Sequence, residues 1–262
     1  MRFICETMLS GGPRHAGEVG MCEDSAGVIT SSGGAMFYLA DATSDQGQVG
    51  YFSSRYLAVS LGSWFLAHGL RSWELTADAD VEKLFKDAWA DMRDELSAEW
   101  NAHARQGGLA EALEKNGEPF QADGESGYLK SFSATFLGGS MTVEGRVVST
   151  VQVGDVDIVV KKTDGQHERW QAPVARVFAQ AMMKSGGEPV LRFFTPVYEK
   201  RAASDIACLL AKTDGVRFWN DEMAVGMIGE GVEAVARFRK LLRRGIRSDT
   251  GDDKALLYLA FL

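Results

Sequence analysis

The sequence predicts an α+β protein in which a β-sandwich carries helices packed on its outside. Apolar runs of strand length, each bounded by Gly, Asp or Ser and rich in β-branched or large apolar residues, indicate buried strands. The long helical patterns come in a group rather than alternating one by one with strands, which favours this layered arrangement over a doubly wound parallel sheet. No shift of composition separates the halves of the chain, so we expect a single domain over residues 1–262.

The expected strands are short segments with almost no polar interruption. They lie at residues 36–40, 147–153, 158–160, 206–210 and 256–261. Because each is apolar on both sides, each should be buried between two layers. Lysine, threonine, aspartate and glycine at 161–166 are typical of the turn of a hairpin.

Two long helical patterns separate the early strands from the later ones. Residues 81–100 place apolar side chains at three-and-four spacing, which predicts a helix with one face on a sheet. Residues 50–68 are apolar around most of the helix circumference, so this helix should be enclosed, and we expect the two to pair as an antiparallel hairpin. Shorter patterns predict helices at 172–184 and 230–244.

The composition excludes several classes of function. Hydrophobic residues make up 45% and charged residues 24%, as in ordinary globular proteins. Lys and Arg total 28 against 36 for Asp and Glu, a net charge of -8, so we expect no nucleic-acid partner. Three scattered cysteines indicate a reducing compartment, and no apolar stretch approaches the roughly 18 residues of a membrane span. We therefore expect a cytoplasmic protein without a membrane partner.

Acidic residues follow or precede the apolar runs rather than lying on helix faces. They are Asp41, Asp214, the pair Glu23 and Asp24, and the pair Asp252 and Asp253. A lone aspartate at such a place most often starts a turn or caps a helix. Several carboxylates held at strand ends can instead bind hard divalent cations such as Mg²⁺ or Mn²⁺, which prefer oxygen ligands.

The order of these segments resembles the type-2C family of metal-dependent protein serine/threonine phosphatases, in its compact bacterial form, over nearly the whole chain. That family has an Asn-Glu-Asp-like motif, then Asp-Gly-x-Gly-Gly, Gly-Asp-Ser-Arg, Ser-Asp-Gly, and Asp-Asn or Asp-Asp before a closing strand. The matching segments here are Cys22-Glu23-Asp24-Ser25, Asp41-Ala42, Gly154-Asp155, Thr213-Asp214-Gly215 and Asp252-Asp253. Ser133-Ala134-Thr135 also resembles the small-residue strand of that family.

The resemblance implies a four-layer αββα sandwich, with two antiparallel sheets flanked by helices. It also implies hydrolysis of phosphoserine or phosphothreonine in proteins by a water activated by two divalent metals, with two or three Mg²⁺ or Mn²⁺ ions bound in all. The implied substrate is a phosphorylated protein, from a cognate Ser/Thr kinase or its targets, and we expect a monomer. The implied metal residues are Asp41 and the carbonyl of Ala42, Asp214 and Asp252, Glu23 and Asp24 through waters, and Asp155 at a third position.

Three departures from the family pattern leave a second function open. Val19 stands where the family has an arginine that holds the substrate phosphate, so Arg14 is the candidate for that role. Ala42 replaces a glycine, and Val156 and Asp157 replace Ser-Arg. The alternative is a catalytically weak or inactive phosphatase-like module that binds or scaffolds a phosphoprotein.

Overall fold

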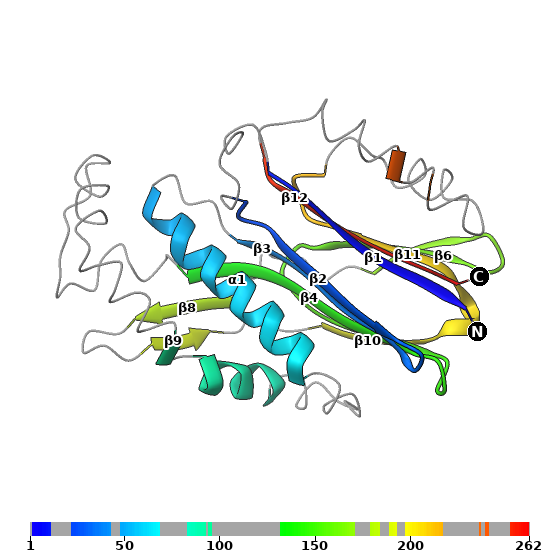
Figure 1. Cartoon of the computed structure of the whole chain (residues 1–262), viewed down its shortest axis with the longest axis horizontal. Helices are drawn as coiled ribbons and strands as arrows, with labels where there is room; N and C mark the ends of the chain where they lie inside the picture. Colours follow the sequence, from blue (N-terminus) through cyan, green and yellow to red (C-terminus); the bar gives the residue numbers. More distant parts are fainter. Residues whose placement is uncertain are drawn as a thin grey trace.

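The computed structural model is a sandwich of two antiparallel sheets with helix α1 (Gln48–His68) across the outer face of one of them (Figure 1). The predicted α+β sandwich is confirmed. The helix expected at 50–68 is α1, and that expected at 81–100 is helical at 83–92 and 94–95. The structure describes residues 2–11, 22–42, 48–68, 83–92, 94–95, 132–170, 179–183, 189–192, 197–216, 236, 239–240 and 252–261.

The first sheet brings the two ends of the described chain together. Its strand order is β1-β12-β11-β6-β7, and neighbouring strands are antiparallel. Phe3 lies opposite Phe261, so the labelled N and C ends are side by side (Figure 1). The strands are β1 (Phe3–Ser10), β6 (Asp157–Lys162), β7 (His167–Trp170), β11 (Ile206–Lys212) and β12 (Lys254–Phe261).

The second sheet is built around β4 (Phe132–Thr142), which pairs with three strands. Its main order is β10-β5-β4-β3-β2, and β8 adds to the start of β4 and pairs with β9. A short 3-10 helix, η4 (Ala203–Asp205), leads from β10 into β11. The other strands are β2 (Ser25–Ser31), β3 (Gly34–Ala42), β5 (Val147–Val153), β8 (Ala179–Met183), β9 (Pro189–Arg192) and β10 (Val197–Ala202).

The side chains of β3 point alternately to the two faces of the second sheet, and each face contributes to a different apolar core. Phe37 and Leu39 point between the sheets and pack with Leu209 and Leu257 of the first sheet. Alternate side chains of β3, including Tyr38, point the other way, under α1. Asp41 continues the inter-sheet row of Phe37 and Leu39, so it stands where the apolar filling between the sheets ends.

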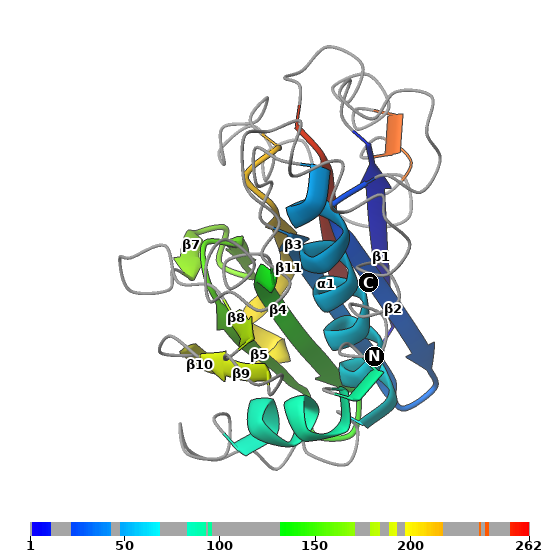
Figure 2. The ribbon, with the colours of Figure 1, turned by 90° about the vertical axis from the view of Figure 1, so that its left-hand side faces the viewer.

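Helix α1 lies close to the second sheet because of a glycine. A Cβ on Gly62 would approach the ring of Tyr38 to 2.1 Å, so a larger residue would force the helix and sheet apart. The Tyr38 hydroxyl in turn shares a buried hydrogen bond of 2.8 Å with Ser25 Oγ. In Figure 2, α1 runs along β3 and β4.

Two expectations about the helices need correction. Residues 83–92 cross the end of α1 at a steep angle rather than forming an antiparallel hairpin with it (Figures 1 and 2). Residues 179–183 form strand β8 and not part of a helix, because β4 and β9 offer them backbone partners that outweigh the helix propensity of Ala, Gln and Met. The remainder of 172–184 lies outside the described residues, as does the glycine-rich stretch before β4.

The outer face of the first sheet is also covered. Tyr258 on that face is 1% exposed. Arg239, one of the three described residues of the helix expected at 230–244, is helical and binds the carboxylate of Glu6, which lies opposite Tyr258. Both observations agree with a helical layer on this side. Among the described residues, no helix is long and apolar enough to cross a membrane.

Candidate active site at the acidic rim

Asp24 is the centre of a buried polar cluster where the two sheets meet. It lies just before β2 and is 5% exposed. The Thr213 hydroxyl, at the end of β11, donates to Asp24 Oδ2 at 2.6 Å. The same hydroxyl accepts the N–H of Ala255 at 2.9 Å, and the Thr213 N–H donates to the Ala255 carbonyl at 3.1 Å. Thr213 therefore ties Asp24 to β11 and β12.

Asp41, which lies near the end of β3, adds to this cluster from the second sheet. Its carboxyl group lies near that of Asp24, and each of the two perturbs the pKa of the other. Thr135 lies opposite Asp41 on β4 and is 2% exposed, and its buried hydroxyl has no hydrogen-bond partner. Ala42 follows in ordinary backbone geometry, since among the described non-glycine residues a positive φ occurs at Arg146.

The segment just before β2 and the segment just before β12 are joined across 230 residues of sequence. The N–H of Glu23 donates to Asp253 Oδ2 at 2.6 Å, and Asp253 is 4% exposed. Beside this contact, Gly215 lies against the Asp253 backbone so closely that a Cβ would come within 1.8 Å of the carbonyl oxygen. The turn carrying Asp214 and the segment carrying Asp252 and Asp253 therefore require glycine at 215.

We call Asp24, Asp41 and Asp253 the inner acids, because their side chains bond to other segments of the chain. The outer acids are Asp155, Asp214 and Asp252. Asp155 and Asp214 are exposed, on the loop between β5 and β6 and on the turn after β11. Asp252 is half-buried, and its Oδ1 accepts the N–H of Asp253 at 3.2 Å.

The charges of these acids act on one another. Burial, opposed by hydrogen bonds from Thr213 and Asp41 and reinforced by the charges of Asp253 and Asp214, raises the pKa of Asp24 to about 7. Burial and the charges of Asp24, Asp214 and Asp155 raise the pKa of Asp41 well above its usual value. The structure therefore brings Asp24, Asp41, Asp155 and Asp214 within electrostatic reach of each other.

The thiol beside this cluster is not a nucleophile. Cys22 occupies the position of the asparagine in the family motif. Burial, with the charges of Asp253 and Asp24, raises the pKa of its thiol to about 12. A thiol with such a pKa stays protonated at neutral pH, so covalent catalysis by Cys22 has no support.

The carboxylate oxygens of the inner and outer acids are suitable ligands for hard divalent cations. Within the described part of the chain, no three His, Cys, Asp or Glu side chains are grouped tightly enough to hold an ion as they stand. However, two neighbouring carboxylates repel each other when both are ionised, and a bound cation relieves this repulsion. Carboxylate oxygens are also the ligands that Mg²⁺ and Mn²⁺ prefer. The buried hydroxyl of Thr135 beside Asp41 is an additional oxygen that can hydrogen-bond a water there.

Sequence reasoning located most of this rim but missed some of its residues. Of the predicted site residues, Glu23, Asp24, Asp41, Ala42, Asp155, Asp214 and Asp252 lie on segments that meet here, whereas Arg14 lies outside the described residues, as does Val19. Asp253, Thr213 and Thr135 had no predicted role. Asp253 was recognisable as a second acid beside Asp252, whereas the hydroxyl bonds depend on contacts between distant segments.

Comparison with known proteins identifies the family. The family model of protein phosphatase 2C matches residues 11–252. The chain therefore belongs to the protein phosphatase 2C family, and the resemblance inferred from the order of its acidic segments is confirmed. No curated protein matches the sequence.

Solved structures share the fold at low sequence identity. The serine/threonine phosphatase Stp1 of Staphylococcus aureus is 14% identical, with a TM-score of 0.59 over 100% of this chain and 96% of that chain. The serine/threonine phosphatase PstP/Ppp of Mycobacterium tuberculosis is 13% identical, with a TM-score of 0.58 over 100% and 99%. RsbX, crystallised with magnesium, is 12% identical, with a TM-score of 0.57 over 98% and 94%. At these identities the likeness shows the fold.

Proposed function

We propose that this chain is a single-domain, metal-dependent phosphatase that hydrolyses phosphoserine and phosphothreonine in proteins. The observation that supports it most is the carboxyl pair of buried Asp24 and partly buried Asp41, which raise the electrostatic cost of ionising one another and are both influenced by the charge of Asp214. Two neighbouring carboxylates destabilise the folded protein when both are ionised, and a bound cation removes this destabilisation. Family membership supports the same chemistry.

The inner and outer acids would share two or three Mg²⁺ or Mn²⁺ ions. Asp41 would serve both of the first two ions, with the carbonyl of Ala42 on one of them and Asp214 and Asp252 on the other, and Asp155 would serve a third. Glu23 and Asp24 would act through waters. Divalent cations in this setting acidify water and neutralise charge on phosphate oxygens.

The protein's own residues would orient the acids rather than attack phosphorus. Thr213 holds the carboxylate of Asp24 in one direction, and Asp253 holds the backbone of Glu23. With these groups fixed, no protein nucleophile is needed, which agrees with the protonated thiol of Cys22. Arg14 would bind the substrate phosphate in place of the arginine absent at position 19.

Hydrolysis of a phosphothreonine peptide and of an aryl phosphate with Mn²⁺ tests the proposal. We expect Asp41→Asn to lower kcat/KM at least 100-fold, as expected when a metal ligand is lost. Asp164→Asn is the matched control, because Asp164 is an exposed turn residue whose Oδ1 accepts the N–H of Gln166. Equal activity of Asp41→Asn, or full activity in excess chelator, would refute the metal-dependent mechanism.

The role of Arg14 has a separate test. Arg14→Ala should raise KM for a phosphopeptide while leaving Mn²⁺ affinity unchanged, because a phosphate contact is lost and no metal ligand is touched. An unchanged KM would assign Arg14 to the surface.

The substrate and assembly state are further parts of the proposal. We propose that the substrate is a phosphorylated kinase or one of its targets, and that the protein acts as a monomer. Mn²⁺ and phosphopeptide binding without turnover would instead identify a phosphatase-like module that binds phosphoproteins.

A further inference from the structure

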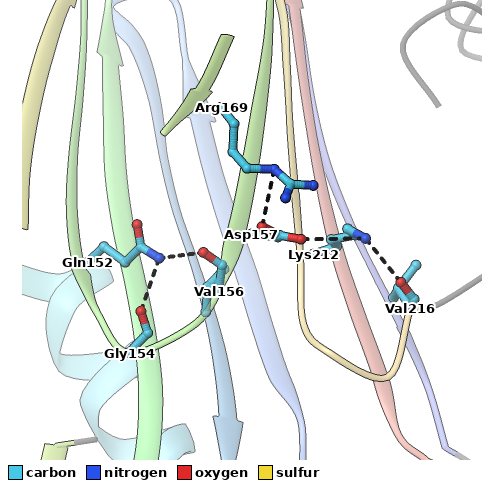
Figure 3. Close-up of polar contacts among 7 residues, drawn as sticks. All are labelled: Gln152, Gly154, Val156, Asp157, Arg169, Lys212 and Val216. Carbon is cyan, nitrogen blue, oxygen red and sulfur yellow. Dashed lines mark hydrogen bonds and ion pairs between the residues drawn. The ribbon is translucent and has the colours of Figure 1, made fainter. Parts of the chain in front are cut away.

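The loop that carries Asp155 is fixed from the second sheet by a buried amide. Gln152 on β5 is 4% exposed, and its Nε2 donates to the carbonyl of Gly154 at 3.2 Å and to that of Val156. Figure 3 shows the amide reaching both carbonyls across the bend of the loop. One side chain therefore holds the backbone on both sides of Asp155.

The same loop is attached to the first sheet by an acidic side chain at a position where the family motif has a basic one. Asp157 stands where the Gly-Asp-Ser-Arg motif has its arginine, and it begins β6 directly opposite Lys212 of β11. The Asp157 carboxylate is flanked by two cations, with Oδ2 at 3.6 Å from Lys212 Nζ and Oδ1 at 3.6 Å from Arg169 Nε (Figure 3).

Lys212 also closes the turn that carries Asp214. Its Nζ donates to the carbonyl of Val216 at 3.3 Å, and the Val216 N–H donates to the carbonyl of Thr213 at 3.2 Å. The lysine side chain is 12% exposed, much less than that of Arg169 at 37%. Lys212 thus contacts both the first residue of β6 and the last residue of the Asp214 turn.

We propose that Lys212 is a positioning residue, which braces the Asp214 turn against the Asp155 loop through Asp157 and so fixes the distance between two of the outer acids. The proposal rests on the metal-dependent function above, because its effect on the site is read through a bound cation. Residues that orient metal ligands from behind typically change metal affinity about 10- to 100-fold when removed.

A general charge effect and a positioning role of Lys212 predict opposite changes in Mn²⁺ affinity for Lys212→Met. Removal of a positive charge near a cation site strengthens cation binding by electrostatics alone. Loss of the brace releases the Asp214 turn and weakens binding. The direction of the change in Mn²⁺ affinity therefore separates a positioning role from a general charge effect.

The first experiment is calorimetric titration of the purified protein with Mn²⁺. We expect Lys212→Met to weaken binding roughly 10-fold, and Lys212→Arg, which keeps a cation at this place, to restore most of it. Arg169→Met is the matched control, because it removes a cation from the same carboxylate and lies on β7, which β6 separates from β11 in the sheet. It should leave affinity unchanged or slightly higher. Unchanged or tighter binding by Lys212→Met would overturn the proposal.

The second experiment uses hydrogen exchange of the metal-free protein, so that it does not depend on the metal. Lys212→Met should speed exchange in peptides covering 154–157 and 213–216, and Asp157→Asn should do the same if Lys212→Met fails to fold. Unchanged exchange in either variant would overturn the brace. Wild-type protein that binds no Mn²⁺ would overturn the proposed function and, with it, the effect of Lys212 on a cation.

Discussion

The inner and outer acids of the rim are held by different means. Asp24 and Asp253 make direct side-chain hydrogen bonds to segments far away in sequence, and both are buried. Asp155 and Asp214 are exposed on short connections whose backbones are held by Gln152, Lys212 and Gly215. Asp24 and Asp253 thus have fixed carboxylates, whereas Asp155 and Asp214 have fixed backbones and exposed side chains.

This difference indicates a division of labour. Fixed, buried carboxylates carry an electrostatic cost that a cation relieves, so the inner acids couple metal binding to stability. Exposed carboxylates carry little such cost and can rearrange when a ligand arrives. Changes to the inner acids should therefore appear in stability and pH dependence, and changes at the outer acids in metal affinity.

The largest expected effect comes from breaking the contact that joins the two groups. Gly215→Ala should destabilise the protein by about 3 kcal/mol and abolish Mn²⁺ binding, because its Cβ would lie 1.8 Å from the carbonyl oxygen of Asp253. Urea unfolding and calorimetry measure the two effects.

Gly33→Ala provides the control for Gly215→Ala. A Cβ on Gly33 would meet its nearest neighbour, Ser31 Oγ, at 3.6 Å, which is an ordinary contact. This variant should unfold and bind Mn²⁺ like the wild type. Equal stability of the two glycine variants would show that the close approach at Gly215 is not required.

An effect that is spread over several pH units is expected from titration of Asp24. Asp24 has a pKa of about 7 in the folded protein and near 3.8 when unfolded, so between these values the folded state binds more protons. The stability that protonation provides is present below about pH 4 and is lost as pH rises to about 7, by at most about 1.4 kcal/mol per pH unit.

The measurement is urea unfolding in chelator between pH 4 and pH 8, with Asp24→Asn for comparison. Wild type should lose stability relative to this variant over that range, and saturating Mn²⁺ should remove the loss. A wild type that gains stability relative to Asp24→Asn as pH rises would contradict the raised pKa.

The smallest effects distinguish two buried threonines. Thr213→Val should cost about 2 kcal/mol, because Asp24 and the N–H of Ala255 both lose a partner. Thr135→Val should leave the metal-free protein unchanged or stabilise it by about 1 kcal/mol, since its buried hydroxyl has no partner to lose. Equal losses in thermal or urea unfolding would mean that Thr135 is bonded in solution.

The sequence allowed the central strands and the acidic segments to be predicted for the same reason. Strands such as β3 and β12 are buried on both faces, so they are mostly apolar, and the acid near the end of β3 and the acids just before β12 mark the rim. The family resemblance supplied the order of the acids. Whether Asp41, Ala42, Glu23, Asp155, Asp214 and Asp252 bind metal stays a prediction.

Edge strands and contacts between distant segments escaped prediction. Strands β1 and β2 mix polar and apolar residues because one of their faces is partly solvated, so no continuous apolar run marks them. The hydrogen bonds of Thr213 and Asp253 link residues 189 and 230 positions away. Only the arrangement of the strands brings these residues together.

The bond between Glu23 and Asp253 has a consequence for biosynthesis. A ribosome produces residue 23 long before residue 253, and the closing strand β12 supplies partners on both of its sides. A nascent chain can form the hairpin of β2 and β3 early, but its acidic rim remains open until β12 has emerged. Contacts of such long sequence separation slow folding. The acidic rim should therefore be assembled only after β12 has paired with β1 and β11.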